Sequence, residues 1–193
     1  MEVAMPDRPL RADARSNQQR LLTVAAEAFA RDGTQTSLKA VAKEAGVGVG
    51  TLYRHFPTRE ALVEAVYERE VTVLCDAADD LLRALGPQAA LPAWMERFVD
   101  FMAAKQGMAE LLRPVLLSEA DRMHTRGRLR AAIATLLDAG AAAGTTRPDA
   151  DANDVLMALG GVTMIAGEEQ QRTLATRLIN LLLHGVQTPN ASP

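Results

Sequence analysis

The sequence predicts an all-α protein, and three observations support this. Aromatic residues make up only 4% of the 193 residues, and the β-branched runs typical of strands are short and rare. Apolar residues instead recur at the three- and four-residue spacing of an amphipathic helix through most of the chain. Hydrophobic residues account for 48% of the sequence, which is enough for one large domain or for a small domain joined to a larger one.

An arm and three helices are expected in the N-terminal third. Residues 1–13 contain two prolines among alternating charges, which indicates a flexible arm. Apolar spacing predicts a first helix over residues 17–32. A second, capped by Thr36 and Ser37, ends at Gly46, and a third of about two turns follows Gly50.

The remaining chain is expected to form a long helix and then a bundle. Thr58 is a suitable N-cap for a helix that reaches Leu85, about 26 residues or about 39 Å long. Four or five further helical stretches follow, at approximately 88–105, 108–117, 122–143, 150–167 and 169–185. The tail, residues 188–193, is polar and contains two prolines, which favours disorder.

The stretch KEAGVGVGTLYRHF, residues 43–56, has glycines at alternate positions directly before a helix. A phosphate-binding glycine loop requires a preceding β-strand, whereas the preceding residues here are helical, and no GK[ST] motif follows. Two short helices joined at Gly46 instead predict a helix-turn-helix, the second helix of which enters the major groove of DNA. Ala42 is small enough for the two helices to cross closely, and Leu52 is placed to pack between them.

Charge supports a nucleic-acid partner for this segment. Residues 1–60 hold nine Lys and Arg against seven Asp and Glu, whereas residues 61–193 hold twelve against seventeen. Lys39, Lys43, Arg54 and Arg59 cluster around the glycines, as expected of a surface that binds the phosphate backbone. An ordinary solvated face would show the same charges.

Other classes of protein find little support. Cys75 is the only cysteine, the three histidines are scattered, and no nucleophile, base and orienting group stand at a recognisable spacing. We therefore expect no enzyme, no cofactor and no metal site. No apolar run approaches the roughly 20 residues of a membrane span, and no signal peptide is visible, so a cytoplasmic protein is expected.

From Thr36 to Leu62 the chain follows the pattern T-S-L-x-x-V-A-x-x-A-G-V-x-x-G-T-L-Y-x-H-F-x-x-[KR]-E-x-L. This pattern resembles the signature of the TetR family of bacterial transcriptional regulators, and the resemblance extends over residues 17–63. It implies an all-helical homodimer with a helix-turn-helix DNA-binding domain, residues 14–58. The long fourth helix would join it to a helical regulatory and dimerisation domain, residues 59–187.

The resemblance also assigns DNA-binding positions, and Lys39 joins them from the basic cluster. Phosphate contacts would fall on Thr36, Ser37, Tyr53, His55 and Arg59, and base-facing positions on Val49, Gly50, Thr51 and Arg54. Two positions depart from the family pattern. Gly48 replaces the serine that usually caps the recognition helix, and Val49 replaces a residue that is commonly polar or basic.

Two further sets of residues are expected in the regulatory domain. A methionine-rich, aromatic lining fits a small apolar effector, with Gly160 and Gly161 allowing close approach: Trp94, Phe98, Met102, Leu112, Leu116, Met123, Met157 and Gly161. Apolar residues on more than one side of helix 150–167, and a leucine stripe on the last helix, suggest a dimer interface: Val155, Leu159, Leu174, Leu178, Leu181 and Leu182. Ordinary packing within one chain would also explain both sets.

The leading hypothesis is a ligand-responsive repressor that binds a near-palindromic operator as a homodimer and is released by its effector. Alternatives are a helical interaction protein that has lost DNA binding and a constitutive repressor without an effector.

Overall fold

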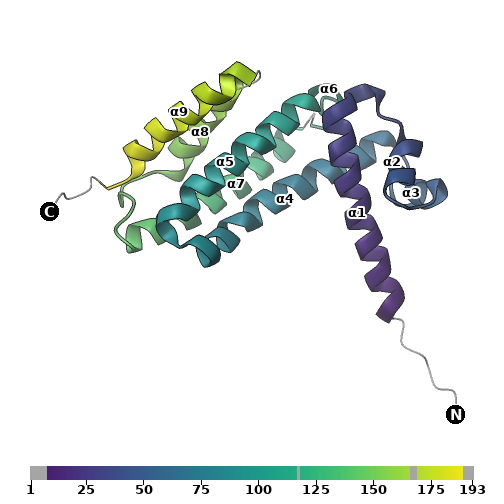
Figure 1. The fold of residues 1–193 in the computed structure, drawn as a ribbon, viewed down its shortest axis with the longest axis horizontal. Coiled ribbons are helices and arrows are strands. Elements are labelled where there is room, and N and C mark those ends of the chain that lie inside the picture. The colour runs from purple at the N-terminus through teal and green to yellow at the C-terminus, as the bar shows by residue number, and fades with distance from the viewer. Residues whose placement is uncertain (1–7, 117, 166–168, 189–193) are drawn as a thin grey trace, which may run out of the picture. The chain divides into compact units, whose positions relative to one another are not determined.

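The structure, a computed structural model, describes the backbone of residues 8–116, 118–165 and 169–188. Its elements in chain order are α1 (Arg8–Asp32), the 3-10 helix η1 (Gly33–Gln35), α2 (Leu38–Glu44), α3 (Val49–His55), α4 (Arg59–Leu85), α5 (Pro87–Gly107), α6 (Ala109–Leu112), α7 (Glu119–Ala142), α8 (Ala152–Ile165) and α9 (Glu169–Val186) (Figure 1). Among these residues, the one β pairing is an isolated bridge between Thr146 and Gln187. The prediction of an all-α fold is confirmed.

The first and sixth helices differ from the sequence prediction. Helix α1 begins at Arg8, so residues 8–13 of the expected arm are helical; Pro9 is tolerated there because the first turn of a helix has no hydrogen bond to lose. Helix α6 spans only Ala109–Leu112 instead of the expected ten residues. The rest of the arm, residues 1–7, and the tail residues 189–193 lie outside the described part of the chain.

The chain forms two compact units. Unit 1 comprises Met1–Arg69 and Gly107–Val115, and unit 2 comprises Glu70–Gln106 and Leu116–Pro193. The division between the two units therefore falls inside α4, between Arg69 and Glu70. The segment that carries α6 also belongs to unit 1, although it is distant in sequence.

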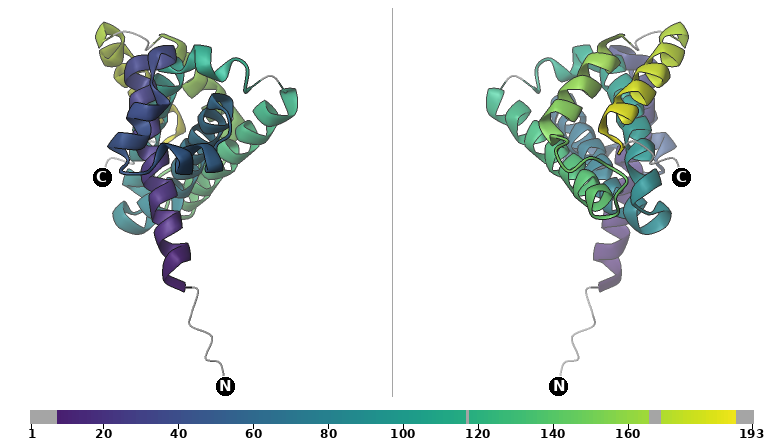
Figure 2. Two further views of the ribbon diagram at one scale, coloured as in Figure 1. Left: turned by 90° about the vertical axis from the view of Figure 1, so that its right-hand side faces the viewer. Right: turned by 90° about the vertical axis from the view of Figure 1, so that its left-hand side faces the viewer.

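Unit 1 is built on the packing of α2 against both α1 and α3, which are seen together in Figure 2. Leu21, Phe29, Val41 and Leu52 are each at most 1% exposed and form its apolar centre. Ala42 is fully buried, in keeping with the close crossing of α2 and α3 that its small side chain permits. Helix α6 packs against η1.

Unit 2 has a core centred on the single tryptophan. Trp94 is fully buried, its Nε1 donates to the carbonyl oxygen of Leu74 at 2.8 Å, and its ring stacks on Phe98 with a centroid separation of 5.7 Å. Helix α8 packs on both α7 and α9, and α8 and α9 lie side by side in Figures 1 and 2. The indole nitrogen is thus satisfied inside an otherwise apolar centre.

Candidate DNA-binding surface

The turn between α2 and α3 depends on Gly46. Its φ is +68°, in the left-handed region that residues with a Cβ rarely adopt. The amide of Gly46 donates to the carbonyl of Lys43, and the amide of Val47 donates to that of Ala42 at 2.9 Å. These bonds satisfy carbonyl groups at the end of α2 and direct the chain into the next helix.

Helix α3 separates an apolar side from a polar one. Leu52 is completely buried and Phe56, directly after the helix, is 6% exposed, whereas Tyr53, Arg54 and His55 are exposed. Gly50 and Arg54 are four residues apart and lie opposite Leu52 and Phe56 on the helix. The exposed side therefore presents one residue without a side chain next to a guanidinium.

Two glycines, Gly48 and Gly50, lie at the start of α3. A Cβ added to Gly50 would meet no atom within 4 Å, so no contact in the described chain explains the glycine. Gly48 is the extended N-cap residue and supplies no side-chain cap, as expected from its replacement of serine. Its carbonyl accepts from the amides of Thr51 and Leu52 at 2.9 and 3.1 Å.

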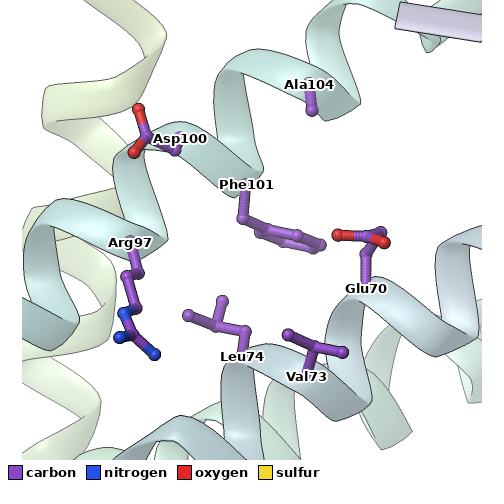
Figure 3. Close-up of a pocket in the computed structure, with 7 residues that line it drawn as sticks. All are labelled: Glu70, Val73, Leu74, Arg97, Asp100, Phe101 and Ala104. Atoms are coloured by element: carbon purple, nitrogen blue, oxygen red, sulfur yellow. The ribbon is translucent and has the colours of Figure 1, made fainter. Parts of the chain in front are cut away.

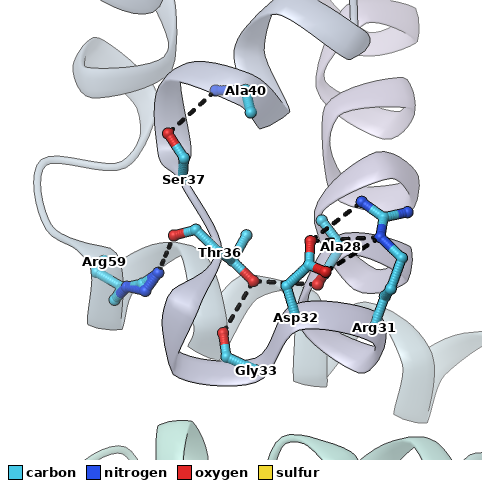
Figure 4. Close-up of polar contacts among 8 residues, drawn as sticks. All are labelled: Ala28, Arg31, Asp32, Gly33, Thr36, Ser37, Ala40 and Arg59. Carbon is cyan, nitrogen blue, oxygen red and sulfur yellow. Dashed lines mark hydrogen bonds and ion pairs between the residues drawn. The ribbon is translucent and has the colours of Figure 1, made fainter.

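Two residues assigned to phosphate contact instead hold unit 1 together (Figure 4). Thr36 is 6% exposed, and its hydroxyl lies 3.0 Å from the carbonyl oxygen of Ala28 and 2.8 Å from that of Gly33. Arg59 donates to the carbonyl oxygens of Thr34 and Thr36, and its guanidinium lies 5.7 Å from the centre of the Phe29 ring. The Thr36 hydroxyl is thus engaged within unit 1, and a phosphate contact by this residue stays a prediction.

Other predicted DNA-binding residues lie at the surface. Ser37 caps α2 by accepting from the amide of Ala40 at 3.4 Å and remains exposed, as does Lys39. Val49 and Thr51 are half-buried at the two sides of α3. Together with Gly50, Tyr53, Arg54 and His55, these residues lie on α2, on its N-cap Ser37 and on α3, all within one unit.

Arg20, a basic residue of the N-terminal segment that was not predicted to bind DNA, holds the end of α2. Its Nε donates to the carbonyl oxygen of Ala45 at 2.7 Å, and its Nη2 donates to Asn17 Oδ1 at 2.8 Å. The guanidinium thus binds the end of α2, where carbonyl groups lack helical partners and the helix dipole is negative. A basic residue on α1 before the apolar Leu21 is a weak signal, because the partner lies 25 positions away.

Arg20→Ala is expected to weaken operator binding while leaving its salt dependence unchanged. The change releases the end of α2 but removes no phosphate contact. Loss of one phosphate contact makes the plot of log K against log salt less steep by about one. The slope is measured by operator titration between low and moderate salt, with Lys39→Ala as the comparison. A slope reduced equally in both variants contradicts the positioning role.

The predicted effector residues differ widely in burial in the described structure. Trp94 and Phe98 are core residues at 0% and 2% exposure, and Leu112 belongs to unit 1. Met123 and Met157 are more than half exposed, at 57% and 54%. The remaining three are half-buried or exposed: Met102, Leu116 and Gly161.

The predicted interface residues divide into two groups. Val155 and Leu159 are 2% and 0% exposed and belong to the core of unit 2. Their role in an interface stays a prediction. Leu181 is 70% exposed, and three other leucines are half-buried: Leu174, Leu178 and Leu182. Met157 and Met164 on α8 are also exposed, at 54% and 81%.

Neither a metal site nor a membrane-spanning helix is found among the described residues. There, no three His, Cys, Asp or Glu side chains are grouped so that they would hold a metal ion. No helix in that part of the chain combines the length and apolar character needed to cross a membrane.

The fold and the exposed side of α3 define a helix-turn-helix DNA-binding protein. Residues 21–66 match the family model of the bacterial regulatory proteins of the tetR family, and residues 86–188 match that of the C-terminal domain of SbtR-like transcriptional regulators. The second match covers more than half of the chain. The chain belongs to the TetR family of bacterial transcriptional regulators.

Solved structures and curated relatives agree with this assignment. A TetR transcriptional regulator from Streptomyces coelicolor is 43% identical with a TM-score of 0.81, and covers 90% of this chain and 99% of its own. A TetR regulatory protein from Mycobacterium vanbaalenii is 35% identical with a TM-score of 0.78, and covers 93% and 100%. An HTH-type transcriptional regulator from Staphylococcus aureus (strain USA300) is 38% identical over 65 residues, 33% of this chain and 35% of the relative. This chain thus matches about a third of the length of that curated relative.

Proposed function

We propose that the protein is a repressor that binds a near-palindromic operator as a homodimer and is released from it by a small, largely apolar effector. The observation that carries the proposal is the exposed side of α3, where Gly50 and Arg54 lie opposite the buried Leu52. Its partner is then double-stranded DNA, and its location is the cytoplasm.

The geometry of α3 suits the major groove. Gly50 allows the helix backbone to approach base edges, and Arg54 supplies the guanidinium that pairs with guanine O6 and N7. Tyr53 and His55 flank this side with groups that donate to phosphate oxygens. In a twofold dimer, two such helices would read half-sites about 34 to 36 Å apart.

Selection from random duplexes is expected to yield a near-palindromic operator, and Arg54→Ala is expected to lower affinity for it. Loss of one bidentate base contact costs about 1–3 kcal/mol, or roughly 5- to 150-fold in Kd. Gly50→Ala should also weaken binding while leaving the fold at least as stable, because the new methyl group meets no protein atom. Titration of the selected operator and urea unfolding measure the two quantities. Unchanged operator affinity in both variants would contradict the claim that α3 contacts the bases.

Two apolar stripes support the homodimer. On α8, Met157, Gly161 and Met164 follow i, i+4, i+7 spacing, and each is exposed. On α9, the stripe consists of Leu174, Leu178, Leu181 and Gly185. These stripes lie on neighbouring helices, and an exposed apolar surface of this kind is typical of a subunit interface.

The glycines in these stripes strengthen the proposal. A glycine inside a helix costs about 1 kcal/mol relative to alanine. A Cβ added to Gly161 or to Gly185 would meet no atom within 4 Å, so packing within the described chain does not require either glycine. Close approach of a helix from a second copy would account for both.

The continuity of α4 supports control by an effector. This helix contributes Arg59–Arg69 to unit 1 and continues as Glu70–Leu85 in unit 2. A ligand that prefers one arrangement of unit 2 would thus change DNA affinity by its differential binding, and a 100-fold change corresponds to about 2.7 kcal/mol. A constitutive repressor would show operator binding that no ligand of unit 2 alters.

A further inference from the structure

We propose that Val49 makes operator affinity depend on the C5-methyl group of a pyrimidine base in each half-site; this inference rests on the function proposed above. Val49 is the first residue of α3, and the N-terminal residues of a recognition helix contact base edges. Its isopropyl group has no hydrogen-bond donor or acceptor. The apolar group that a base presents in the major groove is the C5-methyl group of thymine.

The side chain of Val49 is partly accessible, and its direct neighbours in sequence do not cover it. It is half-buried, whereas Leu52 in the same helix is completely buried. Gly48 and Gly50 on either side have no side chains, and a Cβ added to Gly50 would meet no atom within 4 Å. Branching at Cβ restricts χ1 of a valine, so an apolar contact there costs little side-chain entropy.

Val49 lies in the row of residues next to the proposed guanine contact. Gly50 and Arg54 form one row of α3, and Val49 and Tyr53, also four residues apart, form the adjacent row. Arg54 reads the hydrogen-bond acceptors of guanine, whereas Val49 discriminates only by shape and apolar contact. The two rows would thus read different features of neighbouring base pairs.

A contact of this kind does not distinguish thymine from 5-methylcytosine. The two bases carry the methyl group at the same position of the pyrimidine ring, but thymine presents the O4 acceptor where cytosine presents the N4 donor. A polar side chain at position 49 would respond to that difference, whereas an isopropyl group responds to the methyl group. Methylation of a cytosine placed at this position should therefore raise operator affinity.

The experiment replaces each thymine of the selected operator in turn by uracil, symmetrically in both half-sites. Uracil lacks only the methyl group, so base pairing and the hydrogen-bonding edges are unchanged. At one position, uracil is expected to lower wild-type affinity about fourfold per half-site, or about 15-fold for the full operator. Val49→Ala should reduce this preference to less than about twofold. Titration at fixed salt measures the affinities, and urea unfolding checks that the variant is folded.

A second pair of operators carries cytosine or 5-methylcytosine at the same position, opposite guanine. The wild type should prefer the methylated operator by a factor similar to that for thymine over uracil. Val49→Ala should lose this preference as well. Agreement between the two pairs separates the methyl group from the rest of the base, and the cycle of methyl group and side chain measures their coupling.

Two matched variants test whether the effect belongs to Val49. Val73 is also a valine on a helix, is 50% exposed, and lines a groove formed by residues of α4 and α5 in unit 2 (Figure 3). Val73→Ala should retain the full methyl preference. Thr51, half-buried on α3, has a methyl group of its own that could contact thymine. Thr51→Ser removes that methyl group but keeps the hydroxyl, and it should also retain the preference.

The outcomes separate this inference from the proposed function. No position sensitive to uracil, a methyl preference that survives Val49→Ala, or a preference lost in Thr51→Ser instead would each overturn the inference. A preference for thymine over uracil without one for 5-methylcytosine over cytosine would also overturn it. Failure of the proposed function has a different signature, because no operator is then selected. An operator that depends on Arg54 but on no methyl group overturns the inference alone.

Discussion

Leu181→Glu is expected to convert the protein from a dimer to a monomer and to abolish operator binding while leaving each protomer folded. Leu181 is 70% exposed in the single chain, so a carboxylate there remains hydrated in the monomer. In a twofold interface the change occurs on both subunits, and each buried, unpaired charge costs several kcal/mol. Sedimentation at micromolar concentration measures the assembly, and far-UV circular dichroism checks the fold.

Leu85→Glu is the matched control for this prediction. Leu85 is also a leucine near the end of a helix, at 51% exposure, but it lies on α4, away in sequence from the α8 and α9 stripes. It should leave both assembly and DNA binding unchanged. Gly161→Leu should reproduce the effect of Leu181→Glu by steric obstruction, because its side chain has open space in the protomer. A wild-type monomer, or a dimeric Leu181→Glu that still binds operator, would contradict the interface.

The helix-turn-helix was predictable because its determinants are local. The periodicity of α2 and α3 and the glycine between them specify the turn within a few residues, and Gly46 indeed has a positive φ. Burial of Leu52 follows from the same pattern. A short motif of this kind contains both its packing residues and its turn chemistry.

The roles of Thr36, Arg59 and Arg20 were not predictable in the same way. The hydroxyl of Thr36 donates to a carbonyl group eight positions away in the sequence. The guanidiniums of Arg59 and Arg20 donate to carbonyl groups 23 and 25 positions away. A polar side chain in a basic segment gives the same sequence pattern whether it faces DNA or caps a helix. Only the fold decides which main-chain carbonyl it reaches.

The two sides of α8 show a similar limit. The pattern correctly indicated apolar residues on more than one side, but it did not say which side faces the chain's own core. Val155 and Leu159 turn inward, and Met157, Gly161 and Met164 turn outward. Both sets have helical spacing, so the choice depends on how α7 and α9 pack against the helix.

Gly140→Ala is expected to lower the free energy of unfolding by about 1–3 kcal/mol, although alanine has the higher helix propensity. A Cβ on Gly140 would lie 2.6 Å from Thr146 Oγ1 and 2.7 Å from Thr146 Cγ2. Thr146 has little freedom to move, because it is 4% exposed and its hydroxyl donates to the carbonyl oxygen of Leu137 at 2.9 Å. The adjoining amide of Arg147 also donates to the carbonyl oxygen of Val186, at the end of α9.

Gly127→Ala, in the same helix, is the control with the opposite expected sign. A Cβ on Gly127 meets no atom within 4 Å, so the substitution should stabilise the protein by up to about 1 kcal/mol through helix propensity alone. Urea unfolding of both variants at one protein concentration measures the difference. If the clash with Thr146 is the cause, Gly140→Ala combined with Thr146→Ala should cost less than the sum of the single changes. Additive costs, or a Gly140→Ala variant more stable than the wild type, would contradict this explanation. The segment between α7 and α8 would then move to accept the methyl group at no cost in the free energy of unfolding.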